Sequence, residues 1–381
     1  DRRRAAPDGV AGGQLFTVDH RRLLVLAGFA IVFNIFYLSN VGWIQFTSSR
    51  DEAYRIYDAI WPAGTFGAMT RVCTYMALLV AFVALVRFRR EAKVALALRY
   101  SARVQDDAEA GVDVGAKVLR TNMVLVVIVG LLLANSVNPI SNARYLAGTA
   151  ILAAATALGL FATVSRFRVT AVGFLFSLLV VFPAADAFRY SRSAEIKFTG
   201  PVDALMSGDY DSFAQLINGY LVAVRDGIVP GKQLVGVLAF MVPRSWWAEK
   251  PVDSGIYIAN ARGYGFTNLS GPLWIELFLN GGWVVLIVGM FLLGCWLHRS
   301  DARLDRQFEL YRMPGILGCI LPFYMLILLR GSLLQAMSYL AFILLFAWFV
   351  RARAPRAPVN RTIARPQMAG SSERRSQYAH A

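Results

Sequence analysis

Charge is scarce in this 381-residue chain. Asp, Glu, Lys and Arg make up 17% of the sequence, whereas 57% of the residues are hydrophobic and the mean hydropathy is +0.50. Because a soluble domain is about a quarter charged, this balance excludes a disordered chain and an ordinary cytosolic enzyme. Cysteine is also rare, and its three residues all lie in apolar runs. The sequence therefore excludes a disulfide scaffold and predicts buried thiols.

Long apolar runs dominate the chain instead. A helix needs about 20 apolar residues to cross a bilayer, and a backbone in hydrocarbon must satisfy its own hydrogen bonds. We therefore predict an all-α polytopic membrane protein with about eight transmembrane helices. The chain begins at Asp1 rather than at Met, and we expect further residues upstream. The predicted spans are residues 23–38, 63–86, 118–133, 145–164, 169–183, 272–297, 315–329 and 333–350.

The basic residues predict which side of the membrane each loop faces. With a cytoplasmic N-terminus, most of the 39 Lys and Arg residues fall on the inner side and the short outer loops hold few. Cytoplasmic loops carry an excess of Lys and Arg, so both termini are predicted to be cytoplasmic. This topology explains the net charge of +15, and no nucleic-acid partner is expected.

The predicted organisation has four parts. Helices 1–5 are followed by one large extracytoplasmic segment, by helices 6–8 and by a disordered basic tail. Loops as long as the extracytoplasmic segment usually have a function. These parts cover residues 1–187, with a mixed-charge cytoplasmic loop at 87–117 in which residues 91–117 form a helix pair or a loop, and residues 188–271, 272–350 and 351–381.

Two elements are predicted inside the large extracytoplasmic segment. An apolar stripe over residues 213–224 has helical spacing and predicts a surface helix. Asp211 is placed to cap the start of this helix, and Gly227 with Pro230 is placed to end it. Residues 234–241 are apolar but too few to cross the bilayer, which predicts a re-entrant segment.

The densest group of polar and aromatic residues is Val-Pro-Arg-Ser-Trp-Trp-Ala-Glu-Lys-Pro at residues 242–251. Prolines interrupt regular structure at both of its ends. Arg244 offers a planar fork of donors that suits phosphate, and Lys250 adds a point charge. Trp246 and Trp247 suit either the lipid headgroup boundary or stacking on a sugar. An interfacial anchor and a phosphate and sugar site are both consistent with this pattern.

An acidic residue lies inside the next predicted span. Glu276 and Asn280 are four residues apart and share one face of a helix. A carboxyl group in a span is costly and usually faces a partner in the bundle. One interpretation is structural pairing with Arg71 of the second span, and the other is a polar wall of a site under the extracytoplasmic segment.

Residues 209–282 resemble the oligosaccharide repeat-unit polymerases, the Wzy-type O-antigen polymerases. The resemblance rests on Gly-Asp-Tyr-Asp-Ser-Phe at residues 208–213 and on the pattern Pro-Arg-x-x-Trp-x-x-Lys-Pro at residues 243–251. Gly271, Glu276 and Asn280-Gly281 follow at the expected place. The rest of the chain matches only as a many-span protein with one large outer loop. The resemblance implies a GT-C-like architecture in a bacterial cytoplasmic membrane.

The resemblance also implies an activity: polymerisation of polyprenyl-diphosphate-linked oligosaccharide repeat units into a surface polysaccharide. An acceptor hydroxyl attacks the anomeric carbon of the donor with inversion, and the diphosphate leaves. Fixed cations stabilise that leaving group, and a carboxylate can orient or deprotonate the acceptor. The implied partners are the lipid-linked oligosaccharide, membrane lipid, a chain-length regulator and a flippase. The catalytic candidates are Arg244, then Lys250 and Arg225, with Glu249, Asp253, Asp211 and Glu276 as carboxylates; the substrate-binding candidates are Asp211, Trp246, Trp247, Asp253, Tyr257, Asn280 and Arg189.

Histidine is scarce as well, and its positions separate related functions. His20, His298 and His380 are all predicted to be cytoplasmic or terminal. This excludes a Ser-His-Asp arrangement and a His-ligated metal on the outer face, and no metal or cofactor is expected. The related O-antigen ligases usually carry an outer histidine, so its absence favours a polymerase over a ligase-like or other lipid-sugar glycosyltransferase. A polysaccharide or lipid transporter would place its polar residues near mid-membrane in two corresponding halves.

Overall fold

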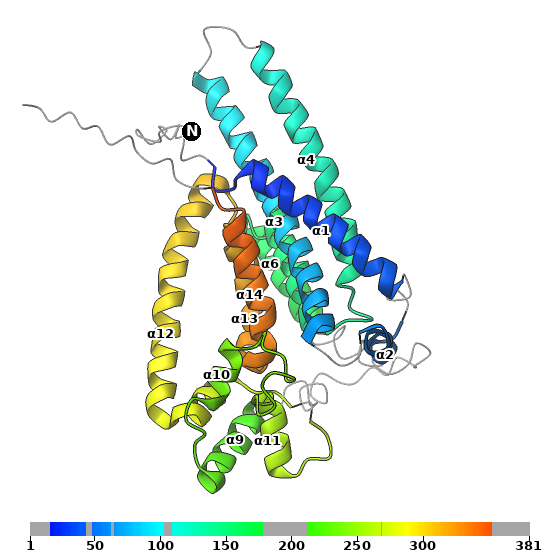
Figure 1. The fold of residues 1–381 in the computed structure, drawn as a ribbon. Coiled ribbons are helices and arrows are strands. Elements are labelled where there is room, and N and C mark those ends of the chain that lie inside the picture. The colour runs from blue at the N-terminus through cyan, green and yellow to red at the C-terminus, as the bar shows by residue number, and fades with distance from the viewer. Residues whose placement is uncertain are drawn as a thin grey trace, which may run out of the picture.

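The computed structural model describes residues 16–42, 48–61, 65–102, 109–177, 212–267 and 269–352. Within these ranges the chain is helical, and the one β-bridge pairs Val18 with Arg351 (Figure 1). The helices are α1 (His20–Val41), α2 (Arg50–Ile60), α3 (Thr65–Ala102), α4 (Glu109–Ser136), α5 (Arg144–Leu158), α6 (Val164–Phe176), α9 (Ser212–Asp226), α10 (Lys232–Leu238), α11 (Ser254–Arg262), α12 (Leu273–Tyr311), α13 (Ile316–Arg330) and α14 (Leu333–Phe349).

Several helices have the length and composition of membrane spans. Four of them are long and apolar enough to cross a bilayer, and they lie within α1, α3, α4 and α12. Three shorter apolar helices, α5, α13 and α14, accompany them. The expected all-helical membrane protein is therefore confirmed at this level. The count of eight spans and the sidedness of the loops stay predictions.

Helix α3 is the centre of the bundle. Its apolar window is 83% buried, and α1, α4, α5, α13 and α14 all pack against it. Nearly every side chain from Thr74 to Val86 is buried, and small residues such as Ala77, Ala81 and Ala84 let neighbouring helices approach closely. A helix that is apolar on all sides belongs in the interior.

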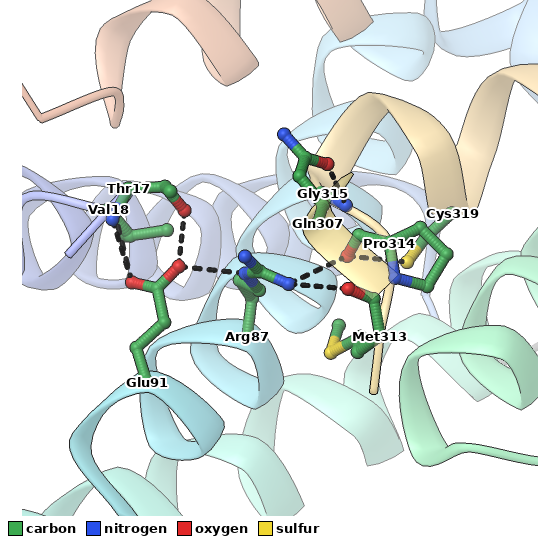
Figure 2. Close-up of polar contacts among 9 residues, drawn as sticks. All are labelled: Thr17, Val18, Arg87, Glu91, Gln307, Met313, Pro314, Gly315 and Cys319. Carbon is green, nitrogen blue, oxygen red and sulfur yellow. Dashed lines mark hydrogen bonds and ion pairs between the residues drawn. The ribbon is translucent and has the colours of Figure 1, made fainter. Parts of the chain in front are cut away.

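A buried ion pair holds one end of this bundle together (Figure 2). The Nε atom of Arg87 donates to Glu91 at 2.7 Å, and its Nη1 atom donates to the Met313 carbonyl at 2.6 Å. Glu91 also accepts from the backbone N–H of Thr17 at 3.0 Å, and the Arg87 guanidinium lies 4.0 Å from the Tyr311 ring centroid. The pair thereby joins α3 to the segment before α1 and to the link between α12 and α13.

Helices α9, α10 and α11 form a smaller cluster at the opposite end of the bundle, beside the start of α12 (Figure 1). Ala223, Ile258, Ile275 and Leu279 make its apolar core. A helix, α9, is present where the surface helix was predicted over residues 213–224, and its place at the membrane surface stays a prediction. It ends at Asp226 and is followed by Gly227, where φ is +87°. Asp211, its predicted cap, lies outside the described residues.

Helix α12 is not the straight span expected over residues 272–297. Gly281 and Gly282 have non-helical backbone angles, and Gly282 has a φ of 62°. Only glycine adopts that conformation readily, so these two residues separate a short first part from the long second part. The first part, which carries Glu276 and Asn280, packs with the α9–α11 cluster, and the candidate span Leu273–Asp305 includes both parts of the helix.

Three further expectations need correction. The predicted spans 145–164 and 169–183 are divided differently, because α5 ends at Gly159 in a left-handed conformation and α6 begins at Val164. Residues 178–183 lie outside the described part.

The cysteines also differ from the expectation of buried thiols, because only Cys319 is buried, whereas Cys73 and Cys295 are half-buried. An apolar run in a membrane protein also faces lipid, so it does not guarantee burial.

Candidate functional site

The two cations of the sequence motif are brought together in one turn, residues 239–251, which we call the motif turn. The guanidinium of Arg244 donates to the carbonyls of Lys250 at 2.6 Å and Pro251 at 3.1 Å. The ammonium of Lys250 donates to the carbonyls of Phe240 at 2.7 Å and Val242 at 2.8 Å. Arg244 therefore bonds to the end of the turn, and Lys250 bonds to its beginning.

Arg244 and Lys250 differ in how many hydrogen-bond donors they still offer to a ligand. Arg244 is exposed, and three of its five N–H donors have no partner among the described residues. Lys250 is only 9% exposed. Its burial lowers the pKa of the ammonium, and the neighbouring charge of Arg244 lowers that pKa further. Arg244 is thus the cation available to a ligand, and Lys250 is a fixed support of the turn.

The exposed surface of the motif turn carries aromatic and acidic side chains. Trp246 is 84% exposed, Trp247 is half-buried, and Glu249 is exposed. The backbone N–H groups of both tryptophans donate to the Pro243 carbonyl, which bends the chain so that Trp246 projects outward. Glu249 has no hydrogen-bond partner among the described residues, so its carboxylate is free to accept from a ligand.

Glu276 has a structural partner, as one interpretation predicted, but that partner is not Arg71. Its Oε1 atom accepts from the backbone N–H of Leu333 at 3.0 Å, and the side chain is 1% exposed. Leu333 is the first residue of α14, so Glu276 satisfies one of the N–H groups that the start of this helix leaves without an intrahelical partner. The kink after Asn280 turns the first part of α12 toward α14, whereas Arg71 faces the tyrosines of α2.

Asn280 also caps another helix. Helix α10 starts after Gly231, which has no side chain to satisfy the first N–H groups. The Oδ1 atom of Asn280 accepts from Gln233 and Leu234 at 3.1 Å each, and its Nδ2 atom donates to the Glu276 carbonyl at 2.7 Å. Glu276 and Asn280 therefore assemble the cluster, because each satisfies the start of a different helix.

Asp253 connects the motif turn to α11. Its carboxylate accepts from the backbone N–H of Gly255 at 2.9 Å and caps the helix. Burial raises the pKa of Asp253, and hydrogen bonds from backbone N–H groups partly offset that rise. A side chain at Gly255 would collide with the Leu269 carbonyl, since a Cβ there would lie 2.1 Å from its oxygen. The segment after α11 therefore packs directly on the start of that helix.

Arg225 belongs to a separate group at the end of α9. It forms a two-pronged ion pair with the adjacent Asp226 at 2.6 Å and 2.7 Å, and it donates to the Ala261 carbonyl at 2.7 Å. Tyr257 is half-buried, and its pKa is raised by burial and then by the charge of Asp226. Among the described residues no hydrogen bond joins this group to the motif turn. Arg189 and Asp211 lie outside the described residues.

A polar cavity of about 170 Å³ lies among the starts of α3, α5 and α14. Among the described residues, Arg71 is the one charged group that lines the cavity. Its guanidinium lies 5.1 Å from the ring centroid of Tyr54 and 5.0 Å from that of Tyr57. The cavity was missed as a site from the sequence, although a charged residue inside an apolar run is a signal of function. Its other polar lining groups are Tyr54, Ser141, Asn142, Tyr145, Gln335, Ser338 and Tyr339.

The cavity and the α9–α11 cluster share α14. Glu276 accepts from the first N–H of α14, and α10 packs against this helix. Gln335, on the first turn of α14, lines the cavity.

A search of protein-family models, of curated proteins and of solved structures found no match to this chain. The functional assignment therefore rests on the motif and on the arrangement of these two sites.

Proposed function

We propose that this protein joins polyprenyl-diphosphate-linked oligosaccharide repeat units into a polysaccharide by glycosyl transfer at the outer face of a bacterial cytoplasmic membrane. The observation that carries the proposal is the geometry of Arg244. Two backbone carbonyls hold its guanidinium, three donors stay available, and exposed aromatic and acidic side chains lie on the same turn. A preorganised cation of this kind is suited to an anion whose charge grows during a reaction.

The reaction breaks the bond between the anomeric carbon of the donor glycan and its diphosphate, and it forms a bond from that carbon to an acceptor oxygen. The diphosphate leaves with the bonding electrons and gains negative charge. In this proposal the free donors of Arg244 bind the diphosphate and stabilise its charge. Lys250 keeps the turn closed around this geometry, because both of its observed hydrogen bonds go to backbone carbonyls.

Among the carboxylates, Glu249 is best suited to receive the proton of the acceptor hydroxyl. Asp253 and Glu276 already accept from helix N-termini, which leaves less of their capacity for a substrate. Glu249 is exposed on the same turn as Arg244 and has no described partner. Trp246 and Trp247 offer ring faces on which sugars can stack.

The test uses the purified full chain in lipid nanodiscs with lipid-linked repeat units from the source bacterium. Long products resolved by gel electrophoresis, insensitive to a metal chelator, are the expected result. Products that are transferred once to a lipid acceptor would instead indicate a ligase. Movement of the substrate across a vesicle membrane without any new glycosidic bond would indicate a transporter, and either outcome would overturn the proposal.

A further inference from the structure

We propose that the cavity around Arg71 is a second anion site, which binds a phosphate group. The first reason is the state of Arg71 itself. Its Nε atom is buried without a hydrogen-bond partner, and no described acidic residue forms an ion pair with it. A buried cation without an anion is costly, and charged groups at membrane depth usually face a ligand or an ion partner.

The neighbouring tyrosines position Arg71 without neutralising it. Tyr54 and Tyr57 of α2 face the guanidinium at 5.1 Å and 5.0 Å, distances at which an aromatic face attracts a cation. This attraction involves no negative charge. The guanidinium therefore keeps its full positive charge and its preference for a planar pair of oxygens.

Helix starts add to the positive potential. Helices α3, α5 and α14 begin around the cavity, and residues from their first two turns line it. Helix N-termini carry a partial positive charge and unsatisfied N–H groups. Ala143, the N-cap residue of α5, supplies no side-chain acceptor, and Ala143 and Tyr145 both line the cavity. At α14, Glu276 accepts from one of these N–H groups, that of Leu333.

The donors approach the cavity from several helices, which favours phosphate over a carboxylate. Arg71 belongs to α3, Ala143 and Tyr145 line the cavity from the start of α5, and the amide of Gln335 belongs to α14. That amide makes no hydrogen bond to another described residue. A tetrahedral phosphate can accept from several directions at once, whereas a carboxylate has two oxygens in one plane. A water molecule occupies about 30 Å³, so a cavity of about 170 Å³ has room for a phosphate group.

The assignment of this phosphate to a lipid-linked sugar rests on the proposed function. Polymerisation brings together two substrates that each carry a diphosphate, and one exposed arginine in the motif turn can hold only one of them. The Arg71 cavity provides a second position, and α14 joins it to the α9–α11 cluster. We infer that the motif turn holds the diphosphate that leaves and that the cavity holds the phosphate of the other substrate.

Binding is tested in nanodiscs of neutral lipid, with Arg244→Ala as the parent protein so that the motif turn contributes little. Polyprenyl diphosphate, phosphatidylglycerol and inorganic pyrophosphate are titrated separately by microscale thermophoresis. We expect polyprenyl diphosphate to bind, and Arg71→Gln to weaken that binding about tenfold, as lost hydrogen bonds to a charged group would. Arg55→Gln is the matched control, because Arg55 is exposed on α2 and does not line the cavity.

Equal affinity of the parent and Arg71→Gln for every probe would overturn the phosphate site. Binding of inorganic pyrophosphate that depends on Arg71, without binding of either lipid, would overturn the lipid assignment. If Arg71→Gln does not fold, Gln335→Ala is measured instead; it should weaken binding severalfold, and an unchanged affinity would overturn the site. If binding depends on Arg71 but the wild-type chain makes no polymer in nanodiscs with lipid-linked repeat units, the proposed function is rejected and the site is retained.

Discussion

Arg244 and Lys250 stabilise the same turn, because the side chain of each bonds to backbone carbonyls at the other residue's end of the turn. The guanidinium of Arg244 donates to the carbonyl of Lys250, and the ammonium of Lys250 reaches back to carbonyls that precede Arg244. A motif that reads as two free cations thus contains one exposed arginine and one buried lysine. The difference determines what substitution of each should do.

Arg244→Ala is expected to abolish long-chain polymer while the protein still inserts in the membrane. Arg244→Lys should also fail, because a point charge cannot hold two carbonyls and a diphosphate in one plane. Chain length is measured by gel electrophoresis of surface polysaccharide, with membrane-inserted protein quantified in parallel. Arg55→Ala is the control and should give normal chains. Normal chain length in Arg244→Ala would remove Arg244 from the reaction.

Lys250→Met should lower the stability of the folded protein, because Lys250 supports the motif turn. The substitution keeps the apolar stem but leaves the carbonyls of Phe240 and Val242 without their donor. Each unsatisfied buried group costs about 1–3 kcal/mol. Thermal unfolding followed by tryptophan fluorescence should show a lower midpoint than for Glu249→Gln, which removes an exposed charge on the same turn. Equal midpoints for the two variants would contradict a supporting role for Lys250.

Asn280→Ala is expected to lose the cap of α10 and to cost about 1 kcal/mol of stability. Asn280→Asp keeps an acceptor for the N–H groups of Gln233 and Leu234, so it should lose less. Hydrogen exchange measured by mass spectrometry should show faster exchange over residues 232–238 in Asn280→Ala alone. A uniform change along the chain would show that the capping interaction is not local.

Arg87→Met should be strongly destabilising, by about 3–5 kcal/mol, since it leaves the buried Glu91 without its partner. The double variant Arg87→Met with Glu91→Met removes both charges and should recover part of this loss. Denaturation in detergent measures the unfolding free energies of the wild-type protein and of both variants. A double variant that is no more stable than Arg87→Met would contradict the pairing as the cause.

Asp253 should make stability depend on pH. Its pKa is raised in the folded protein, so the folded state holds this proton more tightly than the unfolded state does. The contribution is fully present below the unfolded pKa near 3.8 and is lost as pH rises through the folded pKa. Asp253→Asn can still cap α11 and should flatten that dependence. Melting temperatures from pH 4 to pH 8 that fall equally in both proteins would contradict the assignment.

Features that depend on neighbours in the sequence were predictable. The apolar stripe and the glycine after it located α9 and its end, because helix periodicity and a left-handed C-terminal residue are local properties. The motif was also visible as a dense run of Pro, Arg, Trp and Lys. Its hydrogen bonds were not visible, since Arg244 could have pointed to solvent equally well.

The amino-acid sequence by itself determined that this is a helical membrane protein and that Pro, Arg, Trp, Glu and Lys residues gather at residues 242–251. The tertiary structure alone decided the partners of the buried polar groups. Glu276 meets Leu333, 57 positions away, and the Arg71 cavity combines the starts of three helices. The physical reason is that a buried donor or acceptor must be satisfied by whichever group folding brings to it, and local pattern carries no information about that group.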